Sequence, residues 1–184
     1  MSIRRKQPLL ITLMLLAATS SADLAPQPVD KSRVVAAYLY NFGKFVQWPA
    51  EAFPNANSDL DLCLYGNDTL GSAADALNGK NAHGHRIRTN RIRRGGNLEQ
   101  CHIVFVSTSE QLYVQPLLDL TREIPILTVS EIEDFAEAGG IVGLTFHSNR
   151  LKFIVNTGAA TRAGLHLSSQ LLKLAIDIIE ERSP

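Results

Sequence analysis

The stretch Ile103-Val104-Phe105-Val106 is a continuous run of apolar residues, without the alternation of a half-exposed strand. Such a short run is typical of a central strand that is covered on both faces, as in the sheets of α/β proteins. Leu60–Tyr65, which follows a polar loop, is also short and mostly apolar and is placed like a buried strand. We therefore expect these two segments to lie inside one sheet.

Helical and extended segments alternate outward from these strands. Further strands are predicted at 85–92, 126–129, 141–146 and 151–156, the last two as a hairpin through residues 147–150. Helices are predicted at 31–47, 68–77, 110–122, 130–138 and 159–181. This order predicts an α/β fold: a single mixed, mostly parallel β-sheet of about six strands, flanked by helices on both faces.

The first residues have the pattern of an export signal. The basic residues Arg4-Arg5-Lys6 precede the mostly apolar run Leu9–Ala18, and the small residues Ser20 and Ala22 precede Asp23. We expect cleavage after Ala22. The alternative, an uncleaved membrane anchor, is disfavoured because the apolar run is about half of the roughly 20 residues that a membrane-spanning helix needs.

The chain is thus predicted to have three parts. Residues 1–22 form a cleavable signal peptide, and residues 23–32, with two prolines and no periodicity, form a flexible tether. Residues 33–182 form a single α/β domain, without an internal repeat or a linker that would divide it. This domain is expected to function outside the cytoplasm.

The charge of the mature chain argues against nucleic acid as a partner. Three of the 18 basic residues belong to the signal peptide, which has no acidic residue, so 15 bases and 18 acids remain and the net charge is −3. Nucleic acids and anionic lipids attract proteins with an excess of positive charge. After the signal peptide, no apolar stretch is long enough to cross a bilayer, so the mature protein is not expected to be an integral membrane protein.

Cys63 and Cys101 are the only two cysteines of the chain. An oxidising compartment allows them to form a disulfide, which would close a long loop and stabilise the fold by about 4 kcal/mol. The alternative is a pair of buried free thiols. A thioredoxin-type catalyst is not expected, because its two thiols lie in a C-x-x-C motif.

The last predicted helix has more apolar surface than one sheet contact can bury. Its polar residues occupy one narrow face, and the opposite flank carries Leu167, Leu171, Leu174 and Ile178. A neighbouring helix of the same chain could cover this flank. The alternative is an interface with a second copy or with a partner protein.

The sequence lacks clear signs of catalysis, and we expect no catalytic, cofactor-binding or metal-binding residues. The loop Gly66–Ser72 lies between a strand and a helix but has no lysine to reach a phosphate. His83 and His85 could begin a zinc site, yet nothing in the spacing selects a third ligand among the other histidines, and a polar loop explains the pair equally well. The chain is therefore predicted not to be an enzyme.

Five arginines between residues 86 and 94 form the only concentration of charge. Alternation along a strand directs Arg86 and Arg88 to one face, where guanidinium groups could grip a carboxylate or a phosphate. With Arg91, they are the candidate anion-binding residues. The alternative is a charged strand edge that prevents pairing with other sheets.

Several segments together resemble the YfiR/HmsC-like family of periplasmic proteins. The matching segments are Tyr38–Pro49, Phe135–Gly140, Asn149–Asn156, Ala163–Leu165 and Ser168–Ala175. They span nearly all of the mature chain in the expected order. The resemblance implies an exported, periplasmic α/β domain without catalytic activity that regulates cyclic-di-GMP signalling.

The resemblance also implies a mechanism and a partner. In this family the periplasmic protein binds the periplasmic sensor domain of an inner-membrane diguanylate cyclase and holds the cyclase inactive. Family members can form homodimers and disulfides, so Cys63 and Cys101 resemble the family's bridge and redox control of folding is plausible. The competing hypothesis is a periplasmic small-anion sensor or ligand-binding module that uses the arginine strand.

Overall fold

The structure is a computed structural model that describes residues 30–55, 57–148 and 150–180. The predicted signal peptide and residues 23–29 of the predicted tether lie outside the described residues. The tether prediction is wrong for residues 31 and 32, because helix α1 begins at Lys31. The carboxylate of Asp30 caps this helix by accepting hydrogen bonds from the backbone N–H groups of Ser32 and Arg33.

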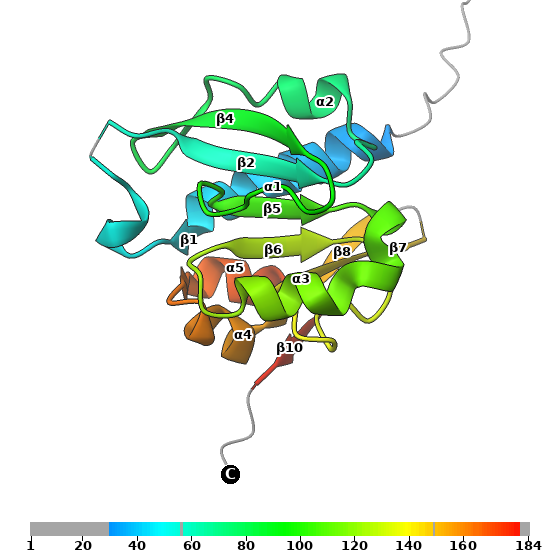
Figure 1. Ribbon diagram of the computed structural model, residues 1–184. Helices are drawn as coiled ribbons and strands as arrows, with labels where there is room; N and C mark the ends of the chain where they lie inside the picture. Colours follow the sequence, from blue (N-terminus) through cyan, green and yellow to red (C-terminus); the bar gives the residue numbers. More distant parts are fainter. Residues whose placement is uncertain (1–29, 56, 149, 181–184) are drawn as a thin grey trace, which may run out of the picture.

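Eight strands of the described chain form one mixed sheet in the order β10-β8-β7-β6-β5-β2-β4-β3 (Figure 1). Their bounds are Leu60–Tyr65 (β2), Asn81–Ala82 (β3), His85–Ile92 (β4), Ile103–Val106 (β5), Leu127–Ser130 (β6), Val142–His147 (β7), Arg150–Asn156 (β8) and Asp177–Ile179 (β10). A separate two-stranded ladder joins β1 (Val46–Gln47) to β9 (His166–Leu167).

The mixed sheet confirms the predicted fold class, but its strand count and strand directions differ somewhat. Strands β4, β2, β5, β6 and β7 pair in parallel, as do β8 and β10. The β7–β8 hairpin and the β3–β4 pair are antiparallel. The count of about six is too low because the short edge strands β3 and β10 lie in segments that carry no strand pattern of their own.

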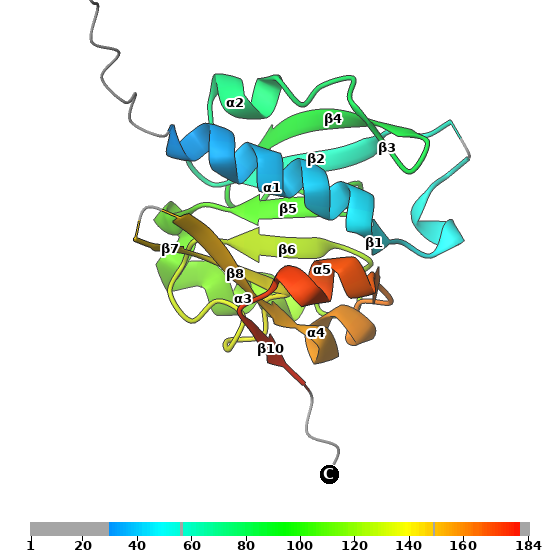
Figure 2. The same ribbon diagram turned by 180° about the vertical axis from the view of Figure 1, so that it is seen from behind.

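Helices cover both faces of the sheet, as predicted. The helices are Lys31–Phe45 (α1), Ser72–Asp75 (α2), Val114–Thr121 (α3), Thr157–Arg162 (α4) and Ser169–Leu174 (α5), and the 3-10 helices are Ala50–Ala52 (η1) and Thr108–Tyr113 (η2). Helices α1 and α5 lie on one face (Figure 2), and α3 lies on the other (Figure 1).

Strand β2 shows why the central strands are mostly apolar. All six of its residues are buried. Leu60, Leu62 and Leu64 belong to the core beneath α1, whereas Cys63 and Tyr65 belong to the core beneath α3. Because successive side chains of a strand point to opposite faces, a strand between two cores needs apolar residues on both.

Helix α1 contributes one apolar face to the larger core. Val35, Leu39 and Phe42 are each at most 1% exposed. The ring of Phe42 makes edge-to-face contacts with Phe153 of β8 and with Tyr38. Burial of each such side chain stabilises the fold by about 1.5–3 kcal/mol, so the apolar spacing of α1 fixes its place across the sheet.

The predicted helix at 159–181 is wrong. Helix α4 ends before Gly164, whose φ of 69° is a left-handed conformation that favours glycine. The chain then forms β9 and the short helix α5, which is capped by the side chain of Ser168. The β-branched residues Ile178 and Ile179 continue as strand β10 beside β8.

The predicted helix at 130–138 is also wrong. Ser130 ends β6, and its hydroxyl donates to the carbonyl of Val106 and accepts from the N–H of Ile132. Asp134 has a φ of 55°, which a continuous helix does not allow. The segment between β6 and β7 is therefore a series of turns. Helix α2 is likewise shorter than the predicted helix at 68–77.

Cys63 and Cys101 form a disulfide, in agreement with one of the two sequence hypotheses. Their Cα atoms lie 5.9 Å apart, and both residues are at most 4% exposed. The bridge joins the middle of β2 to the residues just before β5. The two cysteines are 38 positions apart in the sequence, and their bridge links two neighbouring central strands.

We expect the double variant Cys63→Ser/Cys101→Ser to be about 2–4 kcal/mol less stable than the oxidised protein, because the unfolded chain gains the freedom of an open loop. Urea unfolding, followed by circular dichroism, measures this difference. The reduced wild-type protein is the matched control and should lose a similar amount. Equal midpoints for the oxidised protein and the variant would contradict the prediction.

Candidate interaction site

The end of the sheet at β10 exposes a cluster of large aliphatic side chains. Leu174, Ile176 and Ile178 are 65%, 51% and 38% exposed, respectively. We call these three residues the edge cluster. They come from the end of α5, the residue before β10, and β10 itself. Single apolar residues are common on protein surfaces. These three differ because they are close in the sequence and border an open strand.

The structure divides the predicted apolar flank. Leu167 and Leu171 are 8% and 1% exposed and belong to the core beneath α1. Leu174 and Ile178 are in the edge cluster. The predicted flank is therefore wrong as a single helical surface, because the four residues lie on β9, α5 and β10 and not on one helix. Ile176, which the sequence analysis did not select, completes the exposed part.

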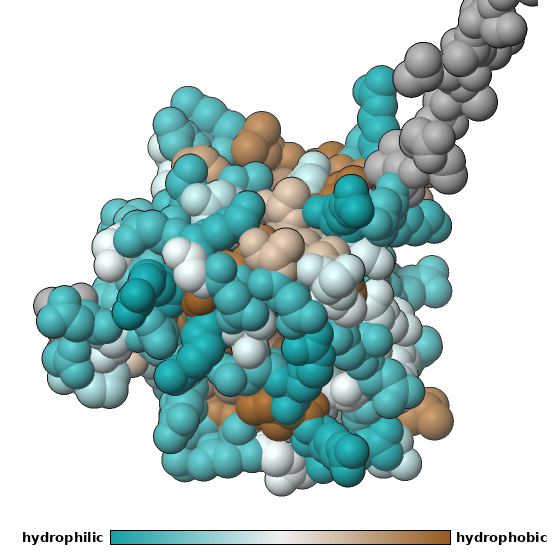
Figure 3. All heavy atoms as spheres, turned by 90° about the horizontal axis from the view of Figure 1, so that it is seen from above, coloured by the Kyte–Doolittle hydropathy of each residue, from teal (hydrophilic) through white to brown (hydrophobic). Residues whose placement is uncertain are grey.

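Strand β10 leaves one side of its backbone open. It pairs with β8 on its inner side, and in the described part of the chain no strand lies on its outer side. The other end of the sheet is better covered: the side chain of Asn78 bonds both the backbone N–H and the hydroxyl of Thr89 in β4. That end, at β4 and α2, is mostly hydrophilic, with apolar side chains in small separate areas (Figure 3).

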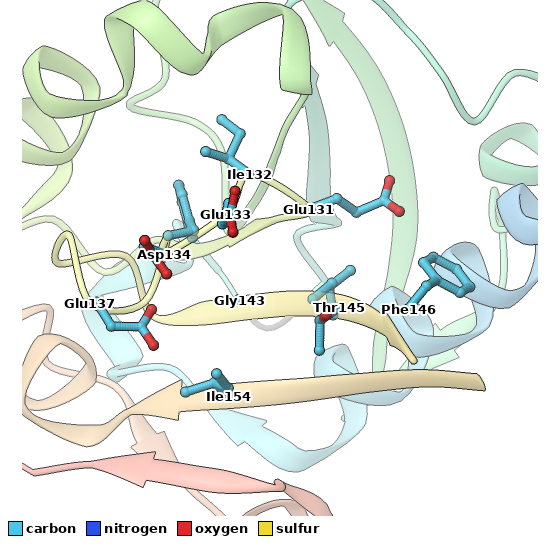
Figure 4. A pocket seen from close by; sticks show the side chains of 11 residues that line it. Glu131, Ile132, Glu133, Asp134, Glu137, Gly143, Thr145, Phe146 and Ile154 are labelled. Carbon is cyan, nitrogen blue, oxygen red and sulfur yellow. The ribbon is translucent and has the colours of Figure 1, made fainter. Parts of the chain in front are cut away.

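A hollow of about 420 Å³ lies over β7 and β8. The strands contribute apolar and small side chains, among them Thr145 and Ile154 (Figure 4). The turns after β6 contribute four carboxylates, those of Glu131, Glu133, Asp134 and Glu137. Ile154 is the register partner of Asp177, so this acidic hollow borders β10. Burial raises the pKa of Glu131, although the charge of Lys31 opposes the shift.

The arginine strand does not present its charges together. Arg88 donates two hydrogen bonds to the buried carboxylate of Asp61, at 2.7 and 2.9 Å, and these raise the pKa of its guanidinium. Arg91 lies 2.7 Å from Asp68 and 2.9 Å from Asp75. Arg86 is exposed. Two of the three candidate anion-binding residues are thus already bound by carboxylates of the protein.

The other residues considered in the sequence have structural roles or remain apart. Asp68, in the loop Gly66–Ser72, accepts hydrogen bonds from the backbone N–H groups of Leu70 and Gly71, so this loop is a capped turn. His83 is exposed, whereas His85 stacks on the ring of Phe53. Within the described residues, no group of three His, Cys, Asp or Glu side chains could hold a metal ion.

An ion pair that the sequence did not predict lies at the carboxyl ends of β4 and β5. Glu110 is 4% exposed and accepts hydrogen bonds from Arg94 at 2.6 Å and from Ser109 at 3.0 Å. The guanidinium of Arg94 also lies over the ring of Tyr113. These contacts lower the pKa of Glu110, with the bond from Arg94 as the largest cause. No local pattern could reveal a pair that the sheet topology brings together.

The described residues thus form an α/β domain with an open sheet edge and exposed aliphatic residues beside it. The chain belongs to the YfiR/HmsC-like family, whose model matches residues 32–176, so the resemblance found in the sequence is confirmed. This family is periplasmic and has a regulatory role in cyclic-di-GMP signalling. In the described part of the chain, no helix has the length and apolar character needed to span a membrane.

The Arg94–Glu110 pair predicts an acid-dependent loss of stability. Because the pKa of Glu110 is lower in the folded protein than its ordinary value of 4.5, the pair stabilises the fold above pH 4.5 and loses this effect as the pH falls through the folded-state pKa. We expect Glu110→Gln to be less stable at pH 7 and to show a smaller loss of Tm between pH 5 and pH 3. Thermal unfolding at several pH values measures this, with the exposed Glu123→Gln as control; parallel curves for Glu110→Gln and wild type would contradict it.

Proposed function

We propose that this protein is a non-enzymatic periplasmic regulator that binds the periplasmic domain of an inner-membrane diguanylate cyclase, or of another sensor protein, and holds it inactive. The observation that carries the proposal is the edge cluster beside the open strand β10, in a chain of the YfiR/HmsC-like family. An N-terminal signal peptide, cleaved after Ala22, would deliver the protein to the periplasm.

The open backbone of β10 and the edge cluster could bind the same segment of a partner protein. The backbone of an open edge strand can pair with an extended segment of a partner, which supplies hydrogen bonds without demanding a particular sequence. The side chains of Leu174, Ile176 and Ile178 would then pack against apolar residues of the same segment. Each fully buried aliphatic side chain contributes about 1.5–3 kcal/mol of transfer free energy, before the entropic cost of association.

The acidic hollow suggests the charge of the partner. Its four carboxylates border β10 on the face where Asp177 lies in register with Ile154. Basic groups on the partner would speed association and favour the correct orientation. The rate of association should therefore fall as the salt concentration rises, because exposed charges are screened over about 10 Å at 0.1 M salt.

Repression requires a difference in affinity between the two states of the cyclase. A tenfold preference for the inactive state supplies about 1.4 kcal/mol, and a nearly complete switch requires about 5.5 kcal/mol. A short edge strand with three apolar side chains is a small contact. Full repression by this protein would therefore need further contacts, and the acidic hollow, whose lining residue Ile154 is in register with Asp177 of β10, is a candidate for them.

Two alternatives make different predictions. A homodimer formed through β10 would bury the edge cluster against its own copy, and would lose that contact when the cyclase binds. A small-anion sensor receives less support, because Arg88 and Arg91 are held by carboxylates of the protein. Light scattering tests the dimer, and thermal shift against a panel of small anions tests the sensor.

We expect Leu174→Asp and Ile178→Asp to bind the cyclase domain at least tenfold more weakly than wild type, because an aspartate in the apolar contact would have to be desolvated. Binding to the isolated periplasmic domain of a cyclase from the same genome measures the affinity, and cellular cyclic-di-GMP should rise in the variants. Leu120→Asp is the matched control: Leu120 is 62% exposed, much like Leu174, but lies on α3.

The same variants separate the outcomes. Leu174→Asp and Leu120→Asp should keep a Tm close to that of wild type, because these side chains are largely exposed, whereas Ile178→Asp should lose some stability, because Ile178 is 38% exposed. Unchanged affinity and unchanged cyclic-di-GMP for both edge variants would argue against the proposed surface. If only the oligomeric state changes, the edge cluster serves the homodimer instead.

A further inference from the structure

Residues 48–55, which include η1, form an arm between β1 and β2 that lies against the amino ends of the central strands. Among the described residues, the hydrogen bonds and ring contacts that join this η1 arm to the sheet involve two histidines. The indole N–H of Trp48 donates to the carbonyl of His102 at 3.2 Å. The ring of Phe53 lies between the rings of His85 and His102, with centroids 3.8 and 4.4 Å away.

The hydrogen bonds of His102 fix its protonation state. Its Nδ1 lies 3.0 Å from the backbone N–H of Asp61, which can only donate. Its Nε2 lies 3.0 Å from the carbonyl of Ala52 in the arm, which can only accept. The ring must therefore be neutral, with its proton on Nε2. A second proton on Nδ1 would place two N–H groups against each other in a buried position.

The titratable and charged groups around His102 lie on β2, on β4 and in the loops that precede β2 and β5. Asp61 of β2 favours the protonated ring, whereas His85 and Arg88 of β4 oppose it. Asp59 and Glu99 also line the hollow beside His102, but neither bonds its ring. Burial is the largest cause of shift and lowers the pKa of His102 below its ordinary value, although the hydrogen bond to the carbonyl of Ala52 opposes the shift. The nearby carboxylates thus fail to offset the burial of the ring.

We propose that the η1 arm is an acid-released clasp: protonation of His102 at Nδ1 detaches residues 48–55 from the amino edge of the sheet while the rest of the domain stays folded. Once both nitrogens are donors, Nε2 can still donate to the carbonyl of Ala52, but Nδ1 can no longer accept from the N–H of Asp61, and the ring must move away from that N–H. If the ring turns away to reach water, it leaves the carbonyl of Ala52 and the face of Phe53.

Detachment would open a hollow that already exists between the arm and the sheet. This hollow has a volume of about 470 Å³ and is lined by Ala52 and Pro54 of the arm and by Asp61, Arg88 and His102 of the sheet. In the released state, His102 would regain the ordinary pKa of a solvated imidazole. The ratio of released to closed arm therefore rises as the pH falls below about 6.5, by up to tenfold for each pH unit, until the closed state is also protonated.

The chain offers a direct reporter of this change, because Trp48 is its only tryptophan. The fluorescence emission of Trp48 should shift to longer wavelength between pH 7.5 and pH 5.0. Hydrogen-exchange protection factors of residues 49–55, corrected for the intrinsic effect of pH, should fall over the same range. Far-UV circular dichroism and the protection of β2 and β5 should stay unchanged.

Three variants test the assignment. His102→Gln keeps a donor and an acceptor but does not titrate, so its emission and exchange should not respond to pH. His85→Gln, which changes the other ring against Phe53, should keep the response. Phe53→Leu weakens the closed arm without removing the titrating group, so its transition should move to higher pH.

Each result bears on the clasp itself and is independent of any binding partner. An unchanged emission and exchange in wild type at pH 5.0 would overturn the proposal, as would an equal response in folded His102→Gln. Loss of protection in β2 and β5 at the same pH as in the arm would also overturn it, because release would then be part of global unfolding. If His102→Gln does not fold, the pH midpoint of the Phe53→Leu transition is the test. A midpoint at higher pH than in wild type supports the proposal, and an unchanged or lower midpoint contradicts it.

Discussion

The burial of β2 on both of its faces is the constraint from which the rest of this fold follows. A strand between two cores requires cover above and below, and α1 and α3 supply it from opposite sides. The Cys63–Cys101 bridge then fastens β2 to the start of β5, its parallel neighbour. Two parallel strands must be joined by a connection that crosses one face of the sheet, and the helices in these connections cover the faces. Exposed strand backbone is therefore expected at the two edges of the sheet.

The two ends of the sheet differ in how they are finished. At β4 the side chain of Asn78 bonds the backbone N–H of Thr89, and Arg88 and Arg91 are paired with carboxylates. At β10 the residues that the structure describes leave one side of the backbone open and expose three aliphatic side chains. Proteins usually protect a strand edge with charge or with bulges, so an apolar open edge is the surface on which the proposed binding is built.

Burial explains which parts of the fold could be predicted from the sequence. The apolar runs at 60–65 and 103–106 identify the central strands because tertiary burial and local pattern agree there. The residues after Ala163 mislead for the opposite reason: leucine and isoleucine suit a buried helix and a buried strand equally, and the choice depends on β8 being free to pair with β10. The ring stack around Phe53 and the Arg94–Glu110 pair arise only from topology, which local spacing does not encode.

The ladder between β1 and β9 brings Val46 opposite Leu167, so the first helix and the last one share a boundary. The carbonyl of Phe45 likewise accepts the N–H of Ser168, at the start of α5. Helix α1 is therefore fully enclosed only after residues 166–168 have docked beside its end. Until then the apolar side chains near that end of α1 stay in contact with water, so the closing of the core couples two segments that lie far apart in the sequence.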